Sequence, residues 1–256
     1  MTSFVRCSVK DEVMTIALDR PEKRNAINRE MLEAIANRLR QATIDDAVRV
    51  VVITGSATVF AAGADLAEFQ KYTLETIHKD PRLECWRAIW AFPKPLIAAV
   101  EGYCLGAGSE LMLACDIVIA GASAKIGQPE INLGFMPGAG GTQILPRRVG
   151  SSVAAYMVLA GGFLSADHAH SLGLVLDITA DGAALDRATE VAAQIAEKAP
   201  LAVQAAVQAL RIARETPLQS GMMMERRLYE KVFASEDRLE GMTAFLEKRS
   251  PVFSGR

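Results

Sequence analysis

Two glutamates in apolar, glycine-rich surroundings are the residues of this sequence best suited to chemistry. Glu110 ends the stretch Gly-Tyr-Cys-Leu-Gly-Ala-Gly-Ser-Glu at 102–110, and Glu130 lies within the glycine-rich stretch 127–141. An ionised carboxylate is costly to bury among such residues unless something pairs with it or uses it. If both face one pocket, burial and like charge should separate their pKa values, so that one acts as base and the other as acid.

Two turns of small residues could polarise a substrate beside these glutamates. Gly106-Ala107-Gly108 is expected to open a helix, whose first amides have no acceptor within the helix. Gly63-Ala64-Asp65 has the same character, with Asp65 placed as a helix N-cap. Small residues let a ligand come within hydrogen-bonding distance of the backbone. Two such turns could donate two N–H groups to one carbonyl oxygen that gains negative charge.

Other interpretations of the same residues are weaker. Gly106-Ala107-Gly108 lacks the last glycine of a dinucleotide fingerprint, because Leu111 stands there, and 138–141 lacks the Gly-Lys-Ser/Thr ending of a phosphate loop. Taken alone, Glu110 could equally be a buried, paired helix carboxylate. His168 and His170 are two residues apart on an expected helix and do not face each other. We therefore predict no metal site.

Strands and helices alternate in the part of the chain that must position these residues. The β-branched run 50–54 is typical of a strand covered on both faces, and residues 55–62 are expected to form a loop. The order favours an α/β core with crossover connections, which places its ligand site at the carboxyl ends of the strands. Strands are expected at 4–9, 13–18, 50–54, 96–100, 117–120, 125–127 and 175–178, and helices at 29–43, 68–91 (interrupted near 80–81) and 107–115.

After residue 141 the pattern becomes mostly helical. Amphipathic stretches are expected to form helices that are separated by prolines and caps. This change of pattern divides the chain into a core, 1–199, that holds the active site, and a C-terminal helical region, 200–256. The expected C-terminal helices cover 183–199, 201–215, 218–234 and 235–249.

Length and composition exclude several classes of function. A chain of 256 residues can bury a large core without disulfides, and its net charge of −2 gives no reason to expect nucleic acid or an anionic membrane as partner. The four cysteines form no C-x-x-C pair, which favours a reducing compartment. Residues 1–19 resemble neither a secretory signal nor a transit peptide. The longest apolar region, 95–124, is interrupted by acids and glycines, so we expect no membrane span and a cytoplasmic protein.

Several separated motifs resemble the crotonase (enoyl-CoA hydratase/isomerase) superfamily. The likeness covers essentially the whole chain, from Arg20-Pro21 to 245–249. It implies a crotonase-like spiral of ββα units and a C-terminal helical region that assembles a homotrimer or a homohexamer. The motifs are Ala-Ala-Gly-Ala-Asp-Leu at 61–66, Gly-Tyr-Cys-Leu-Gly-Ala-Gly-Ser-Glu-Leu at 102–111, Gly-Gln-Pro-Glu at 127–130 and Pro-Gly-Ala-Gly-Gly-Thr-Gln at 137–143.

The resemblance also implies an activity. The amides of Ala64 and Ala107 would form an oxyanion hole for an acyl-CoA thioester, Glu110 would activate water for the β-carbon, and Glu130 would exchange the α-proton. The implied reaction is reversible hydration of a trans-2-enoyl-CoA to a 3-hydroxyacyl-CoA in fatty-acid or aromatic-acid catabolism, with no cofactor beyond the CoA of the substrate. The sequence looks especially similar to hydratases of bacterial phenylacetate and dehydroadipyl-CoA breakdown. The alternatives are a Δ3,Δ2-enoyl-CoA isomerase, which often lacks one of the two glutamates, and a catalytically silent acyl-CoA-binding protein.

Further positions are assigned by the resemblance to binding of CoA and substrate. Most are expected at the nucleotide end of CoA, largely through their backbone, whereas Lys248 is a basic residue that can approach the phosphates. Ala107 departs from the family pattern, because many members have glycine there. Its N–H is retained, and its methyl group is expected to crowd the acyl chain. The assigned positions are Arg24, Ala26, Ala62, Asp65, Leu66, Gly106, Pro129, Gly138 and Lys248.

Overall fold

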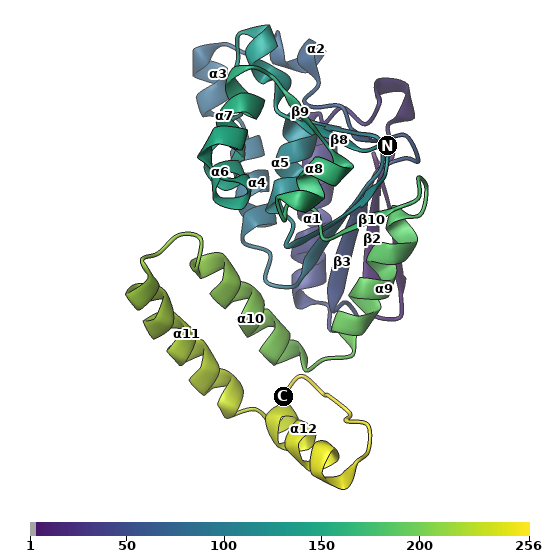
Figure 1. Cartoon of the computed structure of the whole chain (residues 1–256), viewed down its shortest axis with the longest axis vertical. Coiled ribbons are helices and arrows are strands. Elements are labelled where there is room, and N and C mark those ends of the chain that lie inside the picture. Colours follow the sequence, from purple (N-terminus) through teal and green to yellow (C-terminus); the bar gives the residue numbers. More distant parts are fainter. Residues whose placement is uncertain (1–3) are drawn as a thin grey trace.

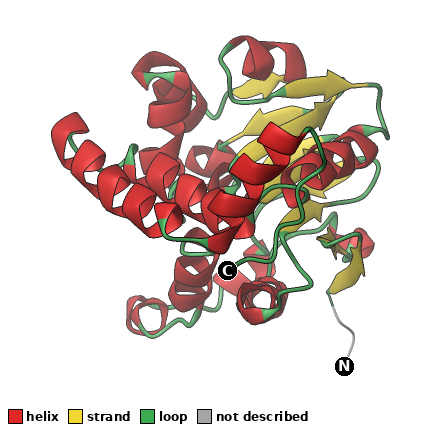
Figure 2. Cartoon of the chain, turned by 90° about the horizontal axis from the view of Figure 1, so that it is seen from below, coloured by secondary structure: helices red, strands yellow, loops and turns green. Residues whose placement is uncertain are grey.

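The larger of two β-sheets forms the framework of the protein. The computed structural model describes residues 4–256 and orders this sheet β1-β2-β3-β5-β7-β10. β1 and β2 form an antiparallel hairpin, and the remaining neighbours pair in parallel. The strands lie between layers of helices (Figure 2). Their bounds are Val5–Lys10 (β1), Val13–Leu18 (β2), Val50–Thr54 (β3), Leu96–Val100 (β5), Ile117–Gly121 (β7) and Asp177–Thr179 (β10).

A second sheet of three-residue strands has the order β4-β6-β8-β9. The expected loop at 55–62 was wrong for three of its residues, because β4 lies there; a strand this short has too few residues to show an alternating pattern. β3, β5 and β7 of the large sheet are each followed by a strand of the small sheet and then by a helix, which confirms the ββα spiral. The bounds are Val59–Ala61 (β4), Tyr103–Leu105 (β6), Lys125–Gly127 (β8) and Phe163–Ser165 (β9).

Both faces of the large sheet are covered, as the β-branched run of β3 predicts. Val50 and Val52 pack with alanines of α9, Ala184–Ala196, on one face. Val51 and Ile53 belong to the main core on the other face, which α1, Arg29–Ile44, also enters. α1 begins after Asn28, whose side chain accepts a hydrogen bond from the Met31 N–H (2.9 Å). The core therefore fixes the strand ends that carry the candidate site.

Short helices surround the ends of the strands (Figure 1). The expected helix at 68–91 is divided into three, because Thr73 caps α3 with a capping box and Pro81 precedes α4. The 3₁₀ segments are η1, Pro21–Lys23, and η2, Pro129–Leu133. The helices are α2, Leu66–Phe69; α3, Leu74–His78; α4, Arg82–Trp90; α5, Ala107–Ala114; α6, Gly141–Val149; α7, Ser151–Leu159; and α8, Ala166–Ser171.

The last three helices form an arm that projects from the core (Figure 1). They are α10, Pro200–Ile212; α11, Leu218–Phe233; and α12, Glu236–Glu247. Arg211 of α10 anchors the arm, since it donates to both carboxylate oxygens of Asp116 (2.9 and 2.7 Å). No residue of α11 is buried. The change near residue 200 is thus the start of α10, and the division into two domains stays a prediction.

Among the described residues, no helix combines the length and the apolar character needed to cross a membrane.

Candidate active site

The amides of Ala64 and Ala107 are both free to bind a ligand. Ala107 is the first residue of α5, so its N–H has no acceptor within the helix. Ala64 follows β4 and precedes Asp65, the N-cap of α2. Within residues 4–256, neither N–H donates a hydrogen bond to another group. Each turn therefore presents one unsatisfied backbone donor, as the sequence predicted.

Pairing along the β4 segment sets the direction of the Ala64 amide. The Ile27 N–H donates to the Gly63 carbonyl (2.8 Å), and the Asp65 N–H donates to the Ile27 carbonyl (3.0 Å). In extended backbone, successive N–H groups point to opposite sides, so the Ala64 N–H points away from Ile27. β6 lies on that other side, where it pairs with β4 and runs into Gly106. The two free amides thus belong to adjoining turns.

Gly106 is the point where the two turns and Glu130 meet. Its φ of +50° is a left-handed conformation that favours glycine. A Cβ placed on Gly106 would lie 3.1 Å from Glu130 Oε1 and 3.5 Å from the Gly63 Cα. A side chain here would therefore crowd the Glu130 carboxylate, while it would meet Gly63 at an ordinary contact distance.

Glu110 lies in the first turn of α5 and is buried, with 3% of its surface exposed. Its Oε1 accepts hydrogen bonds from the N–H groups of Ala139 (2.6 Å) and Gly141 (2.9 Å). Burial raises the pKa of Glu110, and the N–H groups of Gly141, Ala139 and Gly138 oppose that rise. The glycine-rich turn before α6 therefore cradles the anionic form of this carboxylate.

Glu130, the second residue of η2, is less buried but more strongly perturbed. Burial raises the pKa of Glu130 to about 7; its own backbone N–H opposes the rise, and the negative charge of Glu110 adds to it. No backbone cradle like that of Glu110 holds this carboxylate among the described residues. At neutral pH, Glu130 is therefore about half protonated, whereas at Glu110 the backbone N–H groups oppose the effect of burial.

Gln128 contacts Glu130 and Ser109, the residue before Glu110, and sequence reasoning missed it. Its side chain is fully buried, and its amide lies between Ser109 and Glu130. In the orientation that satisfies both neighbours, its NH₂ donates to both Glu130 oxygens (3.0 and 3.2 Å) and its carbonyl accepts from Ser109 Oγ (3.3 Å). A Cβ on Gly141 would lie 3.0 Å from the Gln128 amide atom that faces Ser109. The available signal was an amide side chain two residues before Glu130.

Pro129 and Gly138, which were predicted to bind CoA or substrate, lie beside the glutamates. Pro129 is the first residue of η2, where its fixed φ suits the start of a helical turn immediately before Glu130. The Gly138 N–H faces the Glu110 carboxylate and lowers its pKa. Both residues act through the backbone geometry that they give to the site.

The segments predicted to bind the nucleotide end of CoA also come together. The Ala62 N–H donates to the Arg24 carbonyl (3.1 Å), and Arg24 has a left-handed backbone with φ of +50°. Ala26 lies one residue before the Ile27 bridge, and Leu66 is 49% exposed at the start of α2.

Asp65 has two partners at this edge. Its side chain accepts from the Ala67 N–H (3.1 Å) and pairs with Arg20 (2.7 Å). The hydrogen bond from Arg20 lowers the pKa of Asp65. Asp65 therefore shapes the turn that follows Ala64 and stays ionised.

Lys248 is the one predicted position that the structure does not bring to the site of its own chain. It is exposed and caps the end of α12 with φ of +57°. α12 lies at the opposite end of the molecule's longest axis from α2 (Figure 1). The arm projects away from the core, so Lys248 could meet a site only in another subunit.

This arrangement is suited to chemistry beside a carbonyl group. Two amide donors can hold a carbonyl oxygen as it gains negative charge. Two carboxyl groups in unequal environments, one of them about half protonated at neutral pH, can then move protons on the adjoining carbon atoms. Within residues 4–256, no group of three metal-ligating side chains accompanies them.

Comparisons with known proteins agree with this geometry. The family model for enoyl-CoA hydratase/isomerase matches residues 8–256. A 2,3-dehydroadipyl-CoA hydratase from Escherichia coli is 49% identical, over 97% of this chain and 98% of its own. A mitochondrial enoyl-CoA hydratase from Pongo abelii is 40% identical, over 93% of this chain and 82% of its own. The crystal structure of an enoyl-CoA hydratase from Bacillus anthracis superposes with a TM-score of 0.94 at 36% identity, covering 99% of this chain and all of that one. This chain belongs to the enoyl-CoA hydratase/isomerase family.

Proposed function

We propose that this protein catalyses the reversible hydration of a trans-2-enoyl-CoA to a 3-hydroxyacyl-CoA. The observation that carries the proposal is the unequal environment of two adjacent glutamates beside two free amides. Burial raises the pKa of both carboxyl groups, but three backbone N–H groups oppose the rise at Glu110, whereas the charge of Glu110 adds to the rise at Glu130, whose pKa reaches about 7. Hydration needs such a pair: a base for water and an acid for carbon.

The thioester carbonyl is bound by the N–H groups of Ala64 and Ala107 in this proposal. Donation to its oxygen draws electron density from the conjugated double bond and makes the β-carbon electrophilic. The same donors stabilise the enolate-like charge of the transition state. Loss of one such donor typically costs about 100- to 1000-fold in rate.

The two glutamates then add the elements of water. Glu110 takes a proton from a water molecule while the oxygen of that water bonds to the β-carbon. Glu130 gives its own proton to the α-carbon. The double bond becomes a single bond, so that Glu110 ends protonated and Glu130 ends ionised. Exchange of one proton with solvent restores the pair, and dehydration runs through the same steps in reverse.

Hydration fits this site better than the alternative of Δ3,Δ2 isomerisation. Moving a double bond requires one group that removes a proton and returns it at another carbon. The present site holds two carboxyl groups with different partners, Gln128 at Glu130 and two backbone N–H groups at Glu110, and the N–H groups favour the form of Glu110 that activates water. A site that only binds acyl-CoA has no need of two carboxylates at the thioester, one buried and one half-buried.

Binding of CoA is assigned to the edge formed by Arg24, Ala26, Ala62, Asp65 and Leu66. The backbone groups of this edge adjoin Ala64, and the hollow beside Asp65 is lined by more basic than acidic side chains: Arg20, Lys23, Arg29 and Lys71 against Glu30, Asp65 and Glu68. Such charge suits the phosphates of CoA. The reaction uses no cofactor beyond the CoA of its substrate in this scheme.

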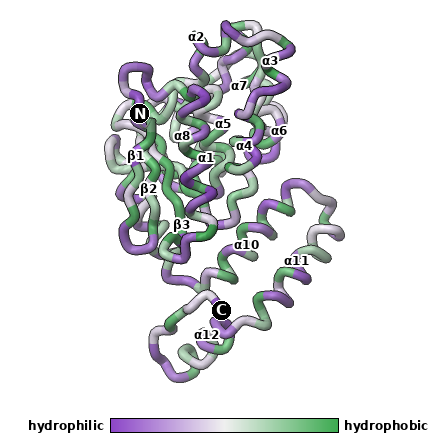
Figure 3. The backbone as a smooth tube through the Cα atoms, turned by 180° about the vertical axis from the view of Figure 1, so that it is seen from behind, coloured by the Kyte–Doolittle hydropathy of each residue, from purple (hydrophilic) through white to green (hydrophobic). Residues whose placement is uncertain are grey.

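The projecting arm supports assembly into a homotrimer or homohexamer. α10, α11 and α12 expose many large apolar side chains, far more than an isolated surface helix requires, and Figure 3 shows hydrophobic residues along the arm. In such an assembly, Lys248 reaches a neighbouring subunit's CoA. These exposed residues include Leu210, Leu218, Met222, Met223, Tyr229, Phe233, Met242, Phe245 and Leu246.

Four unpaired cysteines and the acyl-CoA substrate support a place in the cytoplasm. The E. coli relative is named for a six-carbon enoyl-CoA that ends in a carboxylate, so this compound belongs among the substrates to be tested.

The experiment that tests the function follows crotonyl-CoA in water enriched in oxygen-18. Hydration predicts loss of the ultraviolet absorbance of the conjugated thioester and one heavy oxygen in a 3-hydroxybutyryl-CoA product. Migration of the double bond in 3-hexenoyl-CoA without oxygen incorporation would instead identify an isomerase. No turnover over a panel of chain lengths would leave only acyl-CoA binding.

A further inference from the structure

Asn25 is a polar residue buried behind the turn that presents the Ala64 amide. Only 1% of its surface is exposed, and it lies in the loop between η1 and α1. Its side-chain NH₂ donates to the carbonyls of Phe60 (3.1 Å) and Val59 (3.4 Å), both in β4. Its side-chain carbonyl accepts from the Arg20 N–H (2.9 Å). The amide therefore ties its own loop to the strand that leads into the Ala64 turn.

The backbone of the loop is strained at this residue. Asn25 has a left-handed conformation with φ of +54°, and Arg24 before it has φ of +50°. Asparagine tolerates this conformation better than most residues other than glycine. Two such residues in succession persist only where the surrounding structure requires them. The strained loop places the side-chain amide of Asn25 against β4.

The same loop holds residues 62–65, which we call the oxyanion turn, at several successive positions. Backbone hydrogen bonds join the loop to the turn at Ala62 (3.1 Å) and at Gly63 (2.8 Å). The amide of Asn25 adds a contact one step earlier, on the strand that enters the turn. β6 pairs with the other edge of that strand. The strand is thus held from both sides just before the oxyanion turn begins.

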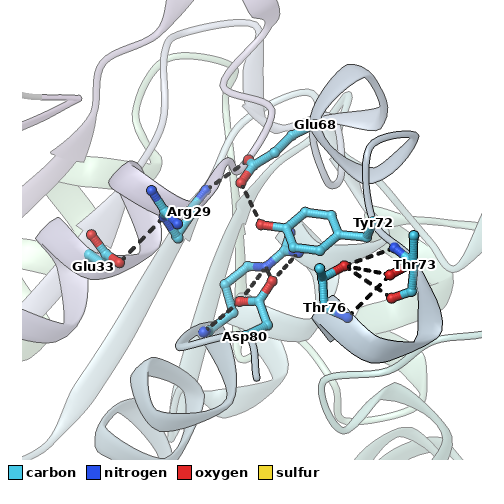
Figure 4. A network of polar contacts seen from close by, with 8 residues as sticks. Arg29, Glu33, Glu68, Tyr72, Thr73, Thr76 and Asp80 are labelled. Atoms are coloured by element: carbon cyan, nitrogen blue, oxygen red, sulfur yellow. Dashed lines mark hydrogen bonds and ion pairs between the residues drawn. The ribbon is translucent and has the colours of Figure 1, made fainter. Parts of the chain in front are cut away.

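The far side of the oxyanion turn is attached at the protein surface. α2 follows the turn, and its Glu68 accepts from the Arg29 N–H (3.0 Å) and from the Tyr72 hydroxyl (3.2 Å). Figure 4 shows Glu68 between Arg29 and Tyr72. The contact with Arg29 is exposed, so water can replace it, whereas the contacts of Asn25 are buried. Loss of the Asn25 amide therefore removes a donor that water cannot readily replace.

We propose that Asn25 is a positioning residue of the reaction, because its amide holds β4 in place and thereby aims the Ala64 N–H at the thioester oxygen. This inference rests on the proposed hydration. Without the amide, the strand before the oxyanion turn is free to shift, and a displacement of about 1 Å can cost about 100-fold in rate. The second donor, the N–H of Ala107, comes from a different segment, so part of the rate remains.

The first test replaces Asn25 by glycine, which accepts the left-handed backbone and removes the amide. In Asn25→Gly, kcat for crotonyl-CoA should fall roughly 10- to 100-fold. The Kd of butyryl-CoA, which has no double bond to hydrate, should change by less than about threefold. Asn37→Gly is the matched control, because this exposed asparagine of α1 also has a side-chain hydrogen bond to lose, and it should keep the wild-type kcat.

Two results of this test would overturn the proposal. An unchanged kcat in Asn25→Gly would show that the position of the Ala64 amide does not depend on Asn25. Weaker binding of butyryl-CoA with an unchanged kcat would show that Asn25 only shapes the edge assigned to CoA.

The stretching frequency of the thioester carbonyl in bound butyryl-CoA reports the two amides directly. Carbon-13 at this carbonyl isolates its band in infrared difference spectra. Donation from Ala64 and Ala107 should lower the frequency in the wild type. Asn25→Gly should lose part of this lowering, and Asn37→Gly should lose none. The full lowering in a folded Asn25→Gly protein would overturn the proposal even if kcat falls.

A second variant, Asn25→Asp, tests donation without loss of volume. An ionised carboxylate cannot donate to the carbonyls of β4, whereas a protonated one can donate one hydrogen bond. The ratio of kcat in Asn25→Asp to kcat in the wild type should therefore rise as the pH falls, while the ratio for Asn25→Gly stays constant. A ratio for Asn25→Asp that does not change with pH would reject donation as the cause. Circular dichroism that shows both variants unfolded would assign Asn25 to folding and reject the proposal.

Failure of the inference and failure of the proposed function give different results. Hydration by the wild type, with the same kcat and carbonyl frequency in Asn25→Gly, retains the function and removes the role of Asn25. Absence of hydration in the wild type removes the function, and the carbonyl frequency of bound butyryl-CoA still decides whether Asn25 positions the Ala64 amide.

Discussion

Replacement of Gln128 by methionine should move the pH dependence of hydration upward. Gln128 donates to both oxygens of Glu130 and thereby stabilises its ionised form. Methionine has a similar size and offers no donor. The pKa of Glu130, already raised to about 7 by burial first and by the charge of Glu110, should therefore rise further in Gln128→Met.

The size of this change follows from the two hydrogen bonds. A hydrogen bond to a charged group contributes about 1.5–3 kcal/mol, which corresponds to about 1–2 pH units. Glu130 is only half-buried, so water can replace part of the lost donation. We therefore expect a shift of about 1 unit, at the lower end of that range.

The sign of the effect on rate follows from the role of Glu130. Hydration uses the protonated acid, so kcat/KM falls as pH rises through its pKa. For the wild type, this falling limb should lie near pH 7, and for Gln128→Met it should lie about 1 unit higher. The two glutamates interact, so the apparent pKa values of the pH profile belong to the pair and not to either residue alone.

The assay is the initial rate of crotonyl-CoA hydration across the pH range, followed by the loss of thioester absorbance. Gln194→Met, the same substitution at an exposed position of α9, is the control and should leave the profile unchanged. A falling limb that stays in place, or moves to lower pH, in Gln128→Met would refute the reasoning about Gln128 and Glu130.

Three further substitutions test other parts of the account. Glu130→Gln should lower kcat for crotonyl-CoA about 100- to 10,000-fold while calorimetry still detects butyryl-CoA binding; full turnover would remove Glu130 from the mechanism. Gly108→Val should displace the start of α5 and abolish activity, because even a Cβ would lie 2.6 Å from the Ala61 Cβ; normal kinetics would contradict the packing. Arg211→Leu should lower the free energy of unfolding by roughly 1–3 kcal/mol in urea titrations, because Asp116 loses its partner; an unchanged midpoint would show that this pair adds no stability.

The regular parts of the fold could be predicted because a buried segment has a recognisable pattern of residue types. The unbroken β-branched run at 50–54 predicts a strand with two covered faces, and β3 has both. Asn28 predicts the start of α1 because its side chain has one simple local role. The three-residue strands of the second sheet, such as β4, are too short to show such a pattern. Their formation depends on pairing with distant segments.

The same distinction separates the predicted from the unpredicted parts of the site. Glu110 and Glu130 are identifiable because a carboxylate among glycines and apolar residues conflicts with its surroundings. Gln128 was missed because its importance lies in contacts across space, to Ser109 and Glu130. Asn25 looks like an ordinary loop residue until the structure shows its buried amide on the carbonyls of β4.

The position of Lys248 depends on assembly and could not follow from one chain. Its residue type and place near the C-terminus suggest a phosphate contact, but the arm carries it away from its own core. Whether it contributes depends on which neighbour covers the apolar faces of α10, α11 and α12. Measurement of the oligomeric state by light scattering tests that assembly directly.

The central claim is that the main-chain N–H of residue 107 polarises the substrate. Ala107 is the first residue of α5, a position where proline fits the helix but offers no N–H. Ala107→Pro should therefore keep the circular dichroism and the melting temperature of the wild type, while kcat for crotonyl-CoA falls about 100- to 1000-fold; Ala107→Gly, which retains the N–H, should stay active. A folded Ala107→Pro protein that hydrates crotonyl-CoA at the wild-type rate would contradict the account.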